Sequence, residues 1–91
     1  MSIEVEHNSE RQRFEIKLDH GSAYLSYTFQ GDSVSFDHTF VPDEFRGKGV
    51  AATLVREALE EARRRNWKVI PQCSYVASFI ERHPEFSALV A

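Results

Sequence analysis

The stretch that decides this fold is residues 45–51, FRGKGVA, where an alternating strand pattern gives way to a helical one. Glycines at the start of a helix let the backbone approach a ligand without a Cβ in the way. The first turn of a helix also presents N–H groups that have no partner inside the helix, at the positive end of its dipole. Together these features predict a cradle for phosphate or pyrophosphate. The alternative is that Gly47 and Gly49 only shape a tight turn, because short glycine patterns also occur by chance.

The residues before this stretch alternate between apolar and polar, which is typical of half-buried antiparallel strands. Breaks at residues 8–9, 20–21 and 31–32 divide them into four runs, and the last two breaks have the length and glycine placement of hairpin turns. We therefore expect a four-strand antiparallel meander, with the phenylalanines and Trp67 in the core. The apolar faces of the four runs are Ile3, Val5 and His7; Phe14, Ile16 and Leu18; Ala23, Leu25, Tyr27 and Phe29; and Val34, Phe36, His38 and Phe40.

The residues after this stretch change to a helical period, which predicts a helix over residues 47–65. Acidic residues placed four positions before arginines, in the pairs Glu60–Arg64 and Glu61–Arg65, would stabilise its polar face. The apolar face of this helix is Val50, Leu54, Val55, Ala58, Leu59 and Ala62.

A short strand over residues 67–70 and a final helix over residues 74–82 complete the chain. Ser74 is the expected cap of this last helix and Pro84 its stop. A strand, a helix and a strand in succession place the two strands in parallel. The expected fold is therefore α/β (α+β), with the order ββββαβα.

Length and composition restrict the class of protein. The chain has 91 residues, which suffice for one domain spanning residues 1–91. Its net charge of −3 argues against nucleic acid as a partner. We expect no membrane span and no signal peptide, and the single cysteine favours a reducing compartment. A cytoplasmic monomer is the expectation.

In the expected architecture, residues 45–51 lie where α/β folds bind their ligands. Ligands of open α/β folds bind beyond the C-terminal ends of parallel strands, where helices begin. Residues 45–51 follow the fourth strand and residues 72–74 follow the fifth, so both should lie at one edge of the domain. A ligand whose phosphates rest on the first segment would extend towards Cys73. The P-loop and the dinucleotide-binding fingerprint both fit this stretch poorly, because their glycine spacing is absent.

At this point the chain resembles a family. Arg46, Gly49 and Ala51 match the pattern Gln/Arg-x-x-Gly-x-Gly/Ala, which binds the acyl-CoA pyrophosphate in the GNAT superfamily of N-acetyltransferases. The chain as a whole is similar to the short, single-domain subgroup of that superfamily, over residues 10–90. The segments that carry this resemblance are HTFVP at 38–42, RGKGVA at 46–51, IPQCSYV at 70–76 and RHPEF at 82–86.

The resemblance implies that the ligand is acetyl-CoA. It would serve as a co-substrate, because its acetyl group is transferred. It implies a pantetheine arm lying between a fourth and a fifth strand that splay apart, with the thioester near Cys73. The cofactor-binding residues that it implies are Thr39, Phe40, Val41, Arg46, Gly47, Lys48, Gly49, Val50, Ala51, Cys73 and Tyr75.

Two features depart from the family pattern. Full-length members have helices between the first two strands that build the acceptor pocket, but here only residues 8–10 separate those strands, so we expect an open acceptor side. Many members also place a tyrosine general acid in the helix after the fifth strand, and that position falls on Glu81 here. The resemblance therefore does not by itself imply direct transfer assisted by that acid.

Two residues are candidates for catalysis. Cys73 is either an inert, partly buried filler or a reactive thiol, since a helix N-terminus lowers the pKa of a thiol. His38 is either a core histidine, because it falls on the apolar face of its strand, or a base near the acetyl end of the ligand. No spacing of His and Cys predicts a metal site.

The sequence thus predicts an acetyl-CoA-dependent N-acetyltransferase acting on an unidentified amine, with Cys73 and His38 as its catalytic residues. The first alternative is a non-catalytic acyl-CoA-binding module, which the missing tyrosine favours. The second is a small interaction domain whose site is vestigial, which would not bind CoA at all.

Overall fold

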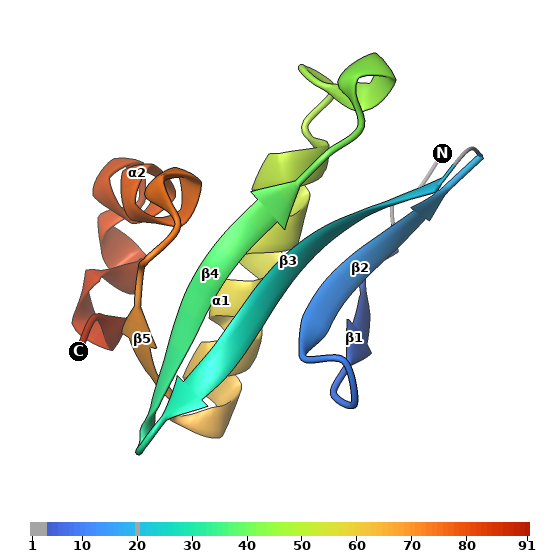
Figure 1. The fold of residues 1–91 in the computed structure, drawn as a ribbon. Coiled ribbons are helices and arrows are strands. Elements are labelled where there is room, and N and C mark those ends of the chain that lie inside the picture. Colours follow the sequence, from blue (N-terminus) through green and yellow to red (C-terminus); the bar gives the residue numbers. More distant parts are fainter. Residues whose placement is uncertain (1–3, 20) are drawn as a thin grey trace.

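The computed structural model describes residues 4–19 and 21–91, and its elements follow the predicted order (Figure 1). Ile3, at the start of the first expected strand, and His20, in an expected turn, lie outside the described residues. The elements are β1 (Glu6–Asn8), β2 (Arg13–Leu18), β3 (Gly21–Gln30), β4 (Ser33–Phe40), the 3₁₀ helix η1 (Asp43–Phe45), α1 (Val50–Arg65), β5 (Lys68–Ile70), α2 (Ser74–Arg82) and the 3₁₀ helix η2 (Pro84–Leu89).

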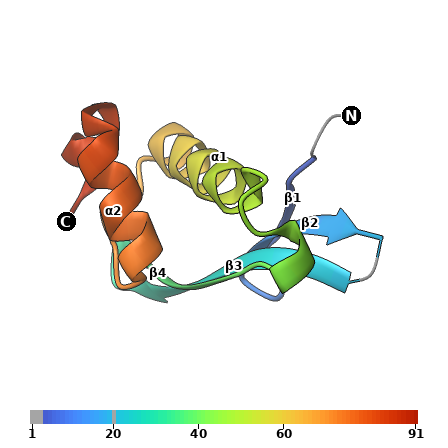
Figure 2. The same ribbon diagram turned by 90° about the horizontal axis from the view of Figure 1, so that it is seen from above.

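The five strands form one sheet in the order β1-β2-β3-β4-β5. The first four pair antiparallel and β5 pairs parallel to β4, as the sequence predicts. Both helices lie on the same face of the sheet and leave the other face open (Figure 2). This one-sided arrangement places the whole core between the sheet and the two helices.

The helix α1 buries the apolar face that its sequence predicts: all six residues of that face are buried. Opposite them lie apolar side chains of the sheet that alternate with polar ones, as a half-covered sheet requires. The sheet side of the core is Phe14, Ile16, Ala23, Leu25, Tyr27, Val34, Phe36 and Val69.

The predicted face of β4 is wrong beyond Phe36. The register of β3 against β4 shifts between Ser26 and Tyr27, which pair with His38 and Phe36, so Asp37 is an extra residue in β4. Such a bulge moves every later side chain to the other face of the sheet. His38 is consequently exposed on the open face, and it is not a core histidine.

Two phenylalanines are exposed, contrary to the prediction, and the bulge explains one of them. Phe40 follows His38 to the open face and is 40% exposed. Phe29, near the end of β3, is 47% exposed, and its ring makes edge contacts with Trp67 and Tyr27, with 5.2 Å and 5.6 Å between ring centroids. The expectation that every phenylalanine lies in the core is therefore wrong for these two.

The helix α1 differs from prediction in two details, its first residue and one of its ion pairs. α1 begins at Val50 and not at residue 47, because Gly47 and Gly49 have φ values of 78° and 79°, which a right-handed helix does not allow. Glu60 forms its ion pair with Arg63, at 3.7 Å, and not with Arg64. The predicted Glu61–Arg65 pair is present, and Glu61 also binds Arg64.

The cap of α2 also differs. Ser74 is the first residue of the helix, and Cys73 occupies the cap position, where no side chain closes the cap with a hydrogen bond. Pro84 ends α2 as predicted but also begins η2. Within the described part of the chain, no helix is long and apolar enough to cross a membrane.

Candidate functional site

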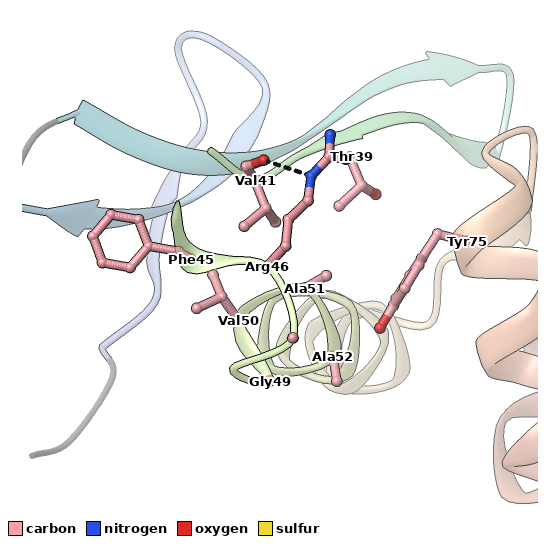
Figure 3. A pocket seen from close by; sticks show the side chains of 10 residues that line it. Thr39, Val41, Phe45, Arg46, Gly49, Val50, Ala51, Ala52 and Tyr75 are labelled. Carbon is pink, nitrogen blue, oxygen red and sulfur yellow. Dashed lines mark hydrogen bonds between the residues drawn. The ribbon is translucent and has the colours of Figure 1, made fainter. Parts of the chain in front are cut away.

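A cleft of about 450 Å³ lies where β4 ends and α1 begins, with α2 closing its far side (Figure 3). Thr39 and Val41 reach it from β4 and the residue after that strand, because the bulge at Asp37 turns them towards the helices. Tyr75 reaches across from α2 towards the first turn of α1 (Figure 3). The lining residues are Thr39, Val41, Phe45, Arg46, Gly47, Gly49, Val50, Ala51, Ala52 and Tyr75.

The floor of this cleft is the open N-terminus of α1. Gly49 occupies the cap position in a left-handed conformation and provides no side-chain hydrogen bond to the first turn. The first turn contains no acidic residue that would neutralise the helix dipole. A Cβ built at Gly47 or Gly49 would meet no atom within 4 Å, so the space in front of both glycines is free for a ligand. The first-turn amides can therefore bind an anion.

Two cations stand at the rim of the cleft. Arg46 is tethered to it, since its Nε lies 3.4 Å from the Val41 carbonyl oxygen (Figure 3) and 3.3 Å from Asp43 Oδ1. The side chain of Arg46 is nevertheless 69% exposed, which leaves its guanidinium accessible to an added anion. Lys48 Nζ lies 5.8 Å from the centre of the Phe45 ring. The helix start favours negative charge, and Arg46 and Lys48 lie near enough to add positive charge to it.

β4 and β5 separate beside the cleft. Their pairing runs from Ser33 with Lys68 to Ser35 with Ile70 and then stops, while β4 continues to Phe40. The Cys73 N–H donates to the Phe36 carbonyl, at 2.8 Å, as the last link between the two. Beyond it, no β5 residue pairs with this edge of β4 among the described residues, so the backbone groups there that Cys73 and Arg46 do not bind can bond an extended ligand.

Cys73 lies at the closed end of this gap. Its Sγ is 3.4 Å from Thr39 Oγ1, and Thr39 itself lines the cleft. Burial raises the pKa of the thiol, but the hydroxyl of Thr39 and the backbone N–H groups of Val76, Tyr75 and Thr39 lower it more. The net pKa is therefore below the ordinary value, and the site favours thiolate.

The structure brings together most, but not all, of the residues that the sequence analysis assigned to the ligand. Phe40 lies on the other face of the sheet. Lys48 and Cys73 do not line the cleft, but Cys73 contacts Thr39, which does. The predicted residues that line the cleft are Thr39, Val41, Arg46, Gly47, Gly49, Val50, Ala51 and Tyr75.

Sequence reasoning missed two lining residues, Phe45 and Ala52. Ala52 could have been found, because the third residue of a helix also has an amide without an internal partner, and a small side chain leaves that amide accessible. Phe45 ends η1, whose presence no periodic pattern indicated. His38 lies outside the cleft, on the opposite face of the sheet.

Comparison with known proteins agrees with this geometry. Residues 13–89 match the sequence profile of the GCN5-related N-acetyl-transferase family, so the chain belongs to that family. Protein NATD1 of Xenopus tropicalis is 35% identical over 86 residues, covering 91% of this chain and 79% of that protein. Protein NATD1 of Homo sapiens is 34% identical over 85 residues, covering 90% of this chain and 75% of that protein.

A solved structure agrees with the fold as well. The NMR structure of a GCN5-like protein from Staphylococcus aureus superposes with a TM-score of 0.77 at 28% identity, covering 98% of this chain and 88% of that one. The resemblance inferred from residues 38–51 and 70–86 is thus confirmed at the level of family and fold.

Proposed function

We propose that this protein binds acetyl-CoA in the cleft at the start of α1 and transfers the acetyl group to an amine. One observation carries the proposal: an uncapped helix start, opened by two left-handed glycines, faces a cation-rimmed cleft that leads along a free strand edge to a thiol. The family to which the chain belongs supports acetyl-CoA as the co-substrate.

Each part of the ligand has a counterpart in the site. The pyrophosphate would accept hydrogen bonds from the first-turn amides of α1, with Arg46 and Lys48 supplying positive charge. The pantetheine amides would pair with the unpaired edge of β4 near Thr39 and Val41. This path brings the thioester to the gap between β4 and β5, beside Cys73.

The chemistry requires that a neutral amine attack the thioester carbonyl, that the carbon–sulfur bond break, and that the amine lose a proton. His38 is exposed on the open face of the sheet, so it would take that proton from an amine approaching from this face. Cys73 would act within the gap, either by accepting the acetyl group from CoA and passing it to the amine or by hydrogen-bonding the thioester.

A non-catalytic acyl-CoA-binding module is the second candidate. The observation that favours it is Glu81, which stands on α2 where many members of the family carry a tyrosine acid. Binding of acetyl-CoA without release of free CoA, over a panel of primary amines, would decide for this candidate.

Replacing Gly49 by asparagine tests the binding site. Asparagine tolerates the left-handed conformation, so Gly49→Asn adds a side chain to the anion site at little backbone cost. We expect acetyl-CoA to bind at least tenfold more weakly by calorimetry, about 1.4 kcal/mol.

The matched control for this test is Gly31→Asn. Gly31 also has a positive φ, 63°, and open space around it, but it lies in the hairpin between β3 and β4, at the far end of the sheet (Figure 1). Its replacement should leave the affinity unchanged. Equal affinity in Gly49→Asn, at an unchanged melting temperature, would contradict the proposed site.

A further inference from the structure

Ser35 is a buried polar residue on the open face of the sheet. It lies in β4 between Val34 and Phe36, which point to the core, so its own side chain points to the face that the helices leave uncovered. Only 1% of Ser35 is exposed, and no other polar residue that the structure describes is buried. A hydroxyl that water does not reach needs a partner within the protein.

The partner of Ser35 is Asp37, the extra residue of the bulge. Ser35 Oγ donates to Asp37 Oδ1 at 2.6 Å, and Thr28 Oγ1, on β3, donates to Asp37 Oδ2 at 2.9 Å. A hydrogen bond to a carboxylate is stronger than one between neutral groups. The bond from Ser35 is partly buried, whereas the bond from Thr28 is exposed and water can replace it. The bond from Ser35 therefore holds Asp37 in place.

The bulge competes with a regular strand. Without the extra residue, β4 would alternate regularly beyond Phe36, and Phe40 would turn towards the helices. Burial of an apolar side chain is favourable, yet in the structure Phe40 is 40% exposed. The apolar spacing of β4 thus favours the regular strand, and the bond between Ser35 and Asp37 offsets that preference.

We propose that Asp37 is a positioning residue of the candidate site: its bond with Ser35 holds the bulge, and the bulge places Thr39 in the cleft against Cys73. Thr39 faces the cleft (Figure 3), and its Oγ1 lies 3.4 Å from Cys73 Sγ. Asp37 does not line the cleft, so it acts on the site through Thr39.

The bulge decides which polar side chain of β4 faces the helices. In the structure this residue is Thr39, which offers its hydroxyl and its backbone N–H to the thiol of Cys73. In the regular strand it would be His38, and Thr39 would turn to the open face. The role of Asp37 in holding a thioester rests on the proposed function, whereas its effect on the thiol does not.

The pH at which alkylation of Cys73 by iodoacetamide reaches half its maximal rate tests this role. Cys73 is the only cysteine of the chain, so the reaction reports on one thiol. Asp37→Ala should raise the midpoint, because Thr39 would no longer bond the thiolate. Loss of a negative charge by itself would favour the thiolate and lower the midpoint. The sign of the shift therefore separates positioning from charge.

Two further variants divide the bond from the charge. Asp37→Asn keeps an acceptor for Ser35 but removes the charge, so its midpoint should not rise above that of the unmodified protein. Ser35→Ala removes the buried bond but keeps the charge of Asp37, so its midpoint should rise as in Asp37→Ala. The matched control is Thr28→Val, which removes only the exposed bond to Asp37 and should leave the midpoint unchanged.

Two results would overturn the inference. One is an unchanged or lower midpoint in Asp37→Ala, and the other is an equal shift in Asp37→Ala and Asp37→Asn, which would mean that only charge matters. If Asp37→Ala does not fold, Ser35→Ala decides, because an unchanged midpoint in that variant contradicts the inference equally.

Calorimetry with acetyl-CoA separates this inference from the proposed function. Asp37→Ala should bind acetyl-CoA about fivefold more weakly, the size expected for one lost hydrogen bond, and Asp37→Asn should bind it as the unmodified protein does. Equal affinity in Asp37→Ala and the unmodified protein would overturn the role of Asp37 in the ligand site. If the unmodified protein does not bind acetyl-CoA, the proposed function is wrong, and the alkylation midpoints still decide whether Asp37 positions Thr39.

Discussion

At the scale of single residues, the pairing of Thr39 with Cys73 is the most informative contact of the site. The two residues lie on different elements, yet Oγ1 and Sγ approach to 3.4 Å. A thiol in this position would stay protonated if burial alone acted on it. The hydroxyl of Thr39 and the amides at the start of α2 reverse that effect, and they lower the pKa of Cys73 below its ordinary value.

This contact predicts how the thiol reacts. The rate of alkylation of Cys73 by iodoacetamide should reach half its maximum at a pH below the ordinary pKa of a thiol. Thr39→Val removes a hydrogen bond to the thiolate, so its midpoint should rise, and Thr39→Ser should restore it. Thr28→Val is a suitable control, because the Thr28 hydroxyl bonds Asp37, at 2.9 Å, and not the thiol. An unchanged midpoint in Thr39→Val would contradict this account of the thiol.

At the scale of elements, β1 is a strand of three residues at the edge of the sheet, and His7 connects it to the core. The ring of His7 stacks on Phe14, with 4.3 Å between centroids, and its Nε2 lies 2.5 Å from the hydroxyl of Tyr27. Its Nδ1 is 4.0 Å from Glu61 on α1. A strand of three residues thus gains one side chain that contacts both the sheet and the helix.

The protonation of His7 should affect stability. Burial and then the positive charge of Arg65 lower the pKa of His7 from 6.5, against the opposing effect of Glu61. Between the folded pKa and 6.5 the unfolded chain binds more protons, so the free energy of unfolding rises with pH across this window. Urea unfolding should therefore give lower stability at about pH 5.5 than at about pH 7.5.

The variant His7→Gln should be less stable at both pH values, because it loses the stack on Phe14, and its stability should change less between them. Glu61 does not disturb the comparison. The pKa of Glu61 is lowered from 4.5, first by its hydrogen bond with Arg64, so its own contribution is lost only in more acidic solution. A variant with the same pH dependence as the unmodified protein would show that another group titrates.

At the scale of the whole molecule, the two faces of the sheet have separate roles. The helices cover one face and build the cleft against it, while His38 lies on the open face, opposite Ser26 of β3 and 6.1 Å from the ring of Tyr24. A substitution at His38 should therefore change neither the core nor the cleft.

We accordingly expect His38→Gln to keep its melting temperature and its affinity for acetyl-CoA. If His38 is the base, release of free CoA in the presence of primary amines should slow by roughly 10²–10⁴-fold. The measurement is the rate of thiol release at saturating acetyl-CoA, beside a thermal melt of the same sample. Full turnover in this variant would remove His38 from the mechanism.

The sequence alone determined the strands and α-helices of this fold, because the hydrophobic period is a local property that the final structure must satisfy. The alternation in β2 and β3 and the helical spacing of Val50, Leu54 and Leu59 were enough to predict most of the residues that are buried there, although Phe29 of β3 is exposed. Gly47 and Gly49 were equally informative. Both have positive φ values, which glycine adopts more readily than other residues, so their presence in the sequence indicates the turn before α1.

Only the tertiary structure decided which way β4 faces beyond Phe36. The extra residue Asp37 cannot be recognised from the sequence of β4 alone. A bulge is defined by the pairing of one strand with its neighbour, here β4 with β3. The contact of Thr39 with Cys73 and the cleft that Ala52 and Tyr75 both line join residues of separate elements. Such contacts depend on how the chain folds back on itself, and the sequence of one element does not contain that information.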